Sequence, residues 1–105
     1  NDVFLLPSGR RVPGVTADLR SYRIGLGVLE AQLVQTERAA LDVNWVPAPA
    51  YAAGDEAKMA ERLSRMFFGE LAIRLHRVDR LPASQNGKVR YGVSTVREPA
   101  GEGAS

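Results

Sequence analysis

The sequence contains no cysteine and only one histidine, His76, in 105 residues. The lack of cysteine excludes disulfide bonds, thiolate metal ligands and a cysteine nucleophile, and it fits a reducing compartment such as the cytoplasm. His76 has no further histidine, cysteine or clustered carboxylates near it in the sequence, so no metal site is predicted. We expect His76 to be a solvent-facing strand residue.

Long hydrophobic runs are also missing. No apolar stretch approaches the roughly 18 residues of a membrane span, and no signal-peptide pattern opens the chain. The 14 basic and 12 acidic side chains leave a net charge of +2, and no run of five like charges occurs. The sequence therefore predicts neither a membrane nor a nucleic acid as partner.

Complete catalytic sets are absent as well. The chain has no glycine-rich phosphate loop, Ser-His-Asp set or carboxylate pair, although an enzyme of this size acting alone would need one. Its first residue is Asn1 rather than Met, and it begins inside a strand-like run. We expect the chain to be a C-terminal piece of a longer protein. Its 45% hydrophobic residues suffice for one small domain with a core.

Hydrophobic periodicity predicts an α+β fold. Short strands at 3–6 and 11–12 flank turn residues and predict an N-terminal β-hairpin, whereas alternation predicts longer strands at 27–37, 40–46 and 71–78. Helices are expected at 16–24 and 55–68, the second with an apolar stripe that includes Met59 and Leu63. The expected architecture is a small two-layer sandwich in which two helices cover a three-stranded antiparallel sheet. A ferredoxin-like order is compatible with the same elements.

The segment from Leu81 to Ser94 contains the strongest candidate for a functional site. Asn86-Gly87 is a strong turn signal between two apolar runs, and it predicts a hairpin-like turn with Lys88 at its tip. The lysine ammonium is a compact charge with three donors, suited to a phosphate or carboxylate brought by another body. Taken alone, the pattern favours an ordinary solvated turn.

Two motifs add a family resemblance. Pro82, four residues, then Gly87-Lys88-Val89-Arg90 resembles the last core motif of the adenylate-forming acyl-CoA synthetases and their relatives. The opening NDVFLLPSGRRV resembles the segment that begins the small C-terminal domain of those enzymes. Its form looks most like the branch that contains phenylacetate-CoA ligase and capsular-polysaccharide-type relatives. The resemblance spans about residues 1–96, and residues 97–105 are expected to be a disordered tail.

The resemblance implies a role for each motif. Lys88, preceded by Gly87, would enter the active site of a preceding large domain and serve carboxylate adenylation. The turn Ser8-Gly9-Arg10 would line the passage for the pantetheine arm of CoA, although a plain hairpin glycine and a solvated arginine explain the same residues. Asn1 and Asp2 stand at the family's hinge, where Asn1 departs from the usual Asp or Lys.

The resemblance also implies the partners. The whole enzyme would be an ATP-dependent, AMP-forming acid–CoA ligase using ATP, CoA and Mg²⁺, and this lid domain would be inactive and without cofactor on its own. Its partners would be the large N-terminal adenylation domain of the same chain and a small carboxylic acid. A carrier protein or an amine as acyl acceptor stays open. The competing hypothesis is a non-catalytic ferredoxin-like regulatory or ligand-binding module.

Overall fold

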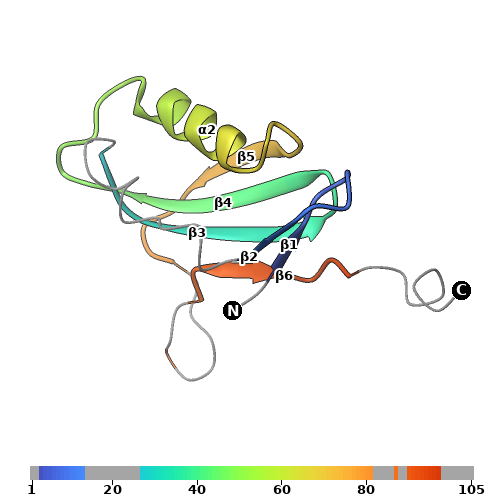
Figure 1. The fold of residues 1–105 in the computed structure, drawn as a ribbon. Coiled ribbons are helices and arrows are strands. Elements are labelled where there is room, and N and C mark those ends of the chain that lie inside the picture. Colours follow the sequence, from blue (N-terminus) through green and yellow to red (C-terminus); the bar gives the residue numbers. More distant parts are fainter. Residues whose placement is uncertain (1–2, 14–26, 82–86, 88–89, 98–105) are drawn as a thin grey trace, which may run out of the picture.

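The computed structural model describes residues 3–13, 27–81, 87 and 90–97. Figure 1 shows the elements in these ranges, which are β1 (Val3–Leu5), β2 (Arg11–Pro13), β3 (Val28–Glu37), β4 (Ala40–Pro47), α2 (Asp55–Met66), β5 (Ala72–Arg77) and β6 (Gly92–Ser94). β1 and β2 pair antiparallel where the sequence predicts a hairpin. The helix expected at 16–24 and residues 98–105 of the expected tail lie outside the described residues.

The main sheet has four strands in the order β5-β4-β3-β6. β3 and β4 are antiparallel, as predicted, but β5 runs parallel to β4, and β6 runs parallel to β3. The prediction of a three-stranded antiparallel sheet with two helices is therefore wrong, because the sheet is mixed and the described residues contain one helix. The connection through α2 allows β5 to return parallel to its neighbour, as in a β-α-β unit.

The hairpin expected over 81–94 is also wrong. Its two arms would be β5 and β6, yet these strands lie at opposite edges of the sheet, and β6 pairs with β3. The Asn-Gly signal describes only local turn preference, and it carries no information about which strand the second arm will join. The described residues contain no helix with the length and apolar character needed to cross a membrane.

Helix α2 forms where its sequence predicts. Asp55 and Glu56 stand in its first turn, where carboxylates complement the helix dipole. The predicted apolar stripe faces the core, since Met59, Leu63 and Phe67 are buried. Asp55 is buried too, and its Oδ2 accepts a hydrogen bond from the backbone N–H of Ala52 at 2.9 Å. α2 thus closes one face of the sheet (Figure 1).

The core lies between this face of the sheet, α2 and the N-terminal hairpin. Alternation places Leu33, Val43 and Trp45 on the buried face, because successive side chains of a strand point to opposite sides. The hairpin contributes Phe4, whose ring meets that of Phe67 edge-on at a centroid distance of 5.4 Å. The hairpin is therefore part of the core and not an appended arm.

One polar side chain sits among these apolar residues. Gln35 of β3 is fully buried, and its amide pairs with the backbone of Leu5, accepting from the N–H at 3.0 Å and donating to the C=O at 2.7 Å. Its Oε1 also accepts from the hydroxyl of Ser94 at 2.8 Å, and its Nε2 donates to the Arg38 carbonyl at 3.3 Å. Gln35 thereby joins the hairpin, β3 and β6.

Candidate functional site

The turn between β1 and β2 holds three of the predicted site residues, Ser8, Gly9 and Arg10. The Leu6 N–H donates to the Arg10 carbonyl and the Gly9 N–H donates to the Leu6 carbonyl, both at 2.9 Å. Gly9 has φ +92°, a conformation that other residues adopt only with strain. A Cβ at this position would meet no atom within 4 Å, so the glycine is required by backbone conformation and not by crowding.

Two residues far away in the sequence hold this turn. The backbone N–H of Ser8 donates to Oε1 of Glu70 and the Ser8 hydroxyl donates to Oε2, both at 2.8 Å. The Arg10 guanidinium lies over the ring of Phe68, 3.9 Å from its centroid. Glu70 and Phe68 belong to the connection between α2 and β5. Sequence reasoning missed both residues, because no spacing rule links positions 60 residues apart.

The backbone conformation of Phe68 is a second indication, beside its contact with Arg10, that this residue supports the turn. It has φ +60°, which is uncommon for a bulky residue, and its side chain is 55% exposed. Glycine would meet this backbone conformation without strain. The conformation places the aromatic ring beneath Arg10, where a guanidinium on an aromatic face is attracted by the ring quadrupole.

The lysine segment is described only in part. Lys88 itself lies outside the described residues, as do Asn1 and Asp2 of the predicted hinge. Gly87 is exposed with φ +76°, a turn conformation that suits glycine. After Lys88, the Arg90 carbonyl accepts from Nε2 of Gln32 at 2.7 Å.

The next residue fixes the segment to β3 as well, because the Tyr91 carbonyl accepts from the N–H of Leu33 at 2.9 Å. On the other side, Leu81 is buried. The chain that carries Lys88 is therefore anchored to the middle of β3 just downstream. The predicted site residues thus fall into two groups on different supports: the Ser8–Arg10 turn on the α2–β5 connection and Gly87 beside β3.

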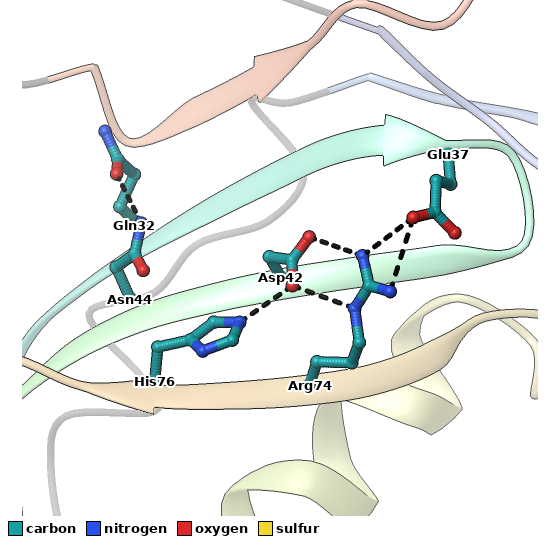
Figure 2. A network of polar contacts seen from close by, with 6 residues as sticks. All are labelled: Gln32, Glu37, Asp42, Asn44, Arg74 and His76. Carbon is teal, nitrogen blue, oxygen red and sulfur yellow. Dashed lines mark hydrogen bonds and ion pairs between the residues drawn. The ribbon is translucent and has the colours of Figure 1, made fainter.

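The sheet face turned away from α2 carries a charged network, drawn in Figure 2. Asp42 of β4 accepts from Nε and Nη2 of Arg74 on β5, at 2.9 and 2.7 Å. Nε2 of His76 lies 2.7 Å from Oδ1 of the same carboxylate, and Arg74 also reaches Glu37 at 3.4 Å. His76 faces solvent as predicted, but it has a carboxylate partner that the sequence did not reveal.

Strand pairing explains this missed partner. Asp42 is opposite Arg74 in the β4–β5 register, and His76 follows two residues later on the same face. Beside this network, the Asn44 side chain donates to the Gln32 side chain at 3.0 Å (Figure 2). Opposite charges compensate each other within the network, and no group of three or more histidine, cysteine, aspartate or glutamate side chains among the described residues could hold a metal ion. We therefore assign the network to stabilisation of the sheet.

The network makes stability depend on pH. The pKa of Asp42 lies below its ordinary value of 3.8, chiefly because Arg74 donates to its carboxylate; burial opposes this effect and His76 adds to it. A lowered pKa in the folded state stabilises the fold above the ordinary pKa, and this stabilisation is lost as pH falls through the folded value.

We expect Asp42→Asn to lower the free energy of unfolding at pH 7 by about 1 kcal/mol or less, since the pair is partly exposed. The difference from the wild type should shrink below about pH 4, where the wild-type carboxylate also becomes neutral. Urea unfolding at a series of pH values measures both quantities. A difference that stays constant down to about pH 2 would contradict an electrostatic origin.

Comparison with known proteins places the chain in a family. A family model described as the CapK C-terminal domain matches residues 7–95. No curated protein matches the chain. The match corrects the assignment to the C-terminal domain of the acyl-CoA synthetases and their phenylacetate-CoA ligase branch, which rested on two short motifs. Because the matched residues run from the first turn to the end of β6, the chain belongs to the CapK C-terminal domain family.

Proposed function

We propose that this domain is the lid of an ATP-dependent, AMP-forming acid–CoA ligase. In the first half-reaction a carboxylate oxygen attacks the α-phosphorus of ATP and pyrophosphate leaves. In the second, a thiol attacks the acyl carbon of the acyl-adenylate and AMP leaves. Lys88 serves the first step, and the Ser8–Arg10 turn serves the second. ATP, Mg²⁺ and the acid bind mainly to a large adenylation domain of the same chain, and the enzyme works in the cytoplasm.

One observation carries the proposal. Lys88 follows an exposed glycine at φ +76° and precedes backbone that is hydrogen-bonded to β3 at residues 90 and 91. Described backbone on both sides of Lys88 supports the proposal that the lysine extends from a fixed part of the domain. This is what a charge supplied to another domain's active site requires, because electrostatic stabilisation works best when the charge is already in place.

The chemistry needs such a charge. Two anions, the carboxylate and the triphosphate, must approach each other, and negative charge increases on the phosphoryl oxygens as pyrophosphate leaves. An ammonium in a cleft that excludes water lowers the energy of that arrangement more than it would in bulk solvent.

ATP–pyrophosphate exchange by the full enzyme tests the proposal. The assay is run over a panel of aryl and aliphatic acids, and at least one acid should support exchange that depends on both the acid and Mg²⁺. Calorimetry on the isolated domain should show little or no ATP binding. If no acid supports exchange, or if the domain alone binds ATP tightly, a regulatory or ligand-binding module becomes the better account.

A further inference from the structure

The Ser8–Arg10 turn is held more firmly than a β-hairpin requires. The hydrogen bonds between Leu6 and Arg10 and between Gly9 and Leu6 already close it. Beyond these, Glu70 binds Ser8 through both carboxylate oxygens, and Phe68 supports the Arg10 guanidinium. We call Ser8, Arg10, Phe68 and Glu70 the turn clamp. Its two contacts involve different side chains of the turn, so together they fix its orientation as well as its position.

The clamp is built at a local cost. Phe68 adopts φ +60° and remains 55% exposed, and Gly69 after it has φ +71°. These two left-handed residues reverse the chain directly after α2 and bring Phe68 and Glu70 to the same side as the turn. Strained residues persist where the surrounding structure requires them, and they are concentrated at functional sites.

The base of the hairpin is fixed as well. Gln35 pairs with both backbone groups of Leu5, and Nε of Arg38 donates to the Leu6 carbonyl at 3.2 Å. The hairpin is thus anchored below the turn by β3 and at the turn by the α2–β5 connection. The clamp therefore determines the pose of the tip, where Gly9 exposes its backbone without a side chain.

We propose that Glu70 is the positioning residue for this turn in thioester formation. This inference rests on the proposed function, in which the turn lines the path of the CoA thiol arm. A narrow ligand that passes Gly9 contacts backbone, so a shift of the turn changes the distance between thiol and acyl carbon directly. A misplacement of about 1 Å can lower a rate by about a hundredfold. Adenylation uses Lys88 on a different support and does not depend on this clamp.

The test compares Glu70→Ala with Glu70→Gln in the full enzyme. Alanine removes both acceptors, whereas the glutamine amide can still accept from the Ser8 N–H and donate to the Ser8 hydroxyl. We expect Glu70→Ala to lower the single-turnover rate of thioester formation from bound acyl-adenylate by about tenfold to a hundredfold. Pyrophosphate exchange should stay within about twofold of the wild type, and Glu70→Gln should restore most of the thioester rate. Glu61→Ala, in an exposed ion pair with Arg65 on α2, is the matched control and should leave both rates unchanged.

A second measurement does not depend on activity. Amide hydrogen exchange in this chain should show faster exchange at Ser8 in Glu70→Ala, with Glu70→Gln close to the wild type. Equal loss of both half-reactions in Glu70→Ala would overturn the positioning role and make Glu70 a residue of general stability. Faster amide hydrogen exchange at Ser8 in Glu70→Ala, together with an unchanged rate of thioester formation, would also overturn the positioning role. A wild-type enzyme that adenylates but forms no thioester would refute the role of the turn. The amide hydrogen exchange at Ser8 would still show whether Glu70 holds the turn.

Discussion

Replacing Lys88 by alanine is expected to lower the rate of ATP–pyrophosphate exchange by about two to three orders of magnitude. The reason is that one positive charge stabilises the charge developing on the α-phosphate, and the loss of one such preplaced group typically has an effect of this size. KM for ATP should change much less than kcat, because the charge acts mainly in the transition state. Steady-state exchange at several ATP concentrations measures both.

The chain offers a close control for this change. Lys58, on the exposed side of α2, is the other lysine of the sequence, and Lys58→Ala removes the same charge from a position without a proposed role. Its exchange rate should equal that of the wild type. Lys88→Arg keeps the charge but replaces a compact ammonium by a planar fork, so partial activity is expected. An exchange rate in Lys88→Ala equal to that of Lys58→Ala would refute the role of Lys88.

Gln35→Leu should lower the free energy of unfolding by about 3 kcal/mol. Leucine has a similar size, but it removes the hydrogen-bonding partner of the N–H and C=O of Leu5 in a buried region. It also removes the Gln35 oxygen that accepts from the hydroxyl of Ser94. Each buried polar group that loses its hydrogen bond costs about 1–3 kcal/mol, and water relieves part of this. Since a small domain has a total stability of about 5–15 kcal/mol, the effect is large.

Urea unfolding measures this loss, and Ser94→Ala is the graded control. That variant removes one of the four hydrogen bonds of the Gln35 amide and should lower the free energy of unfolding by about 1 kcal/mol. Hydrogen exchange should also show lost protection at the Leu5 amide in Gln35→Leu. If Gln35→Leu has the same free energy of unfolding as Ser94→Ala, the amide contributes no more than one ordinary hydrogen bond. Its proposed role in holding the hairpin, β3 and β6 together is then wrong.

The parts of the fold that the sequence predicted depend on neighbouring residues. The apolar stripe of α2 follows from helical spacing, and the β3–β4 pair follows from two alternating runs separated by a short turn. The turn with Gly9 and the exposed Gly87 follow from residue type alone. Each of these features is decided by residues that lie close together in the sequence, so a single sequence contains the information.

What the sequence did not reveal depends on which distant segments meet. Nothing in the residues of β6 states that it will join β3 rather than β5, since both partners would accept the same alternation. Gln35 stands on the apolar face of β3 but gives no sign that its amide will pair with Leu5. The Glu70–Ser8 contact likewise joins two segments that are ordinary surface sequences by themselves. Contacts between distant segments therefore determine the strand order of the sheet, the pairing of Gln35 with Leu5 and the turn clamp.

β5 and β6 lie at opposite edges of the sheet, and residues 78–91 connect them. Both strands meet this connection at the same end of the sheet, because β5 is parallel to β4, β6 is parallel to β3, and β3 and β4 are antiparallel. Crossing three strand spacings requires about 14 Å. An extended chain over residues 78–91 could cover about 45 Å. The distance that this connection must cross is thus about a third of its contour length.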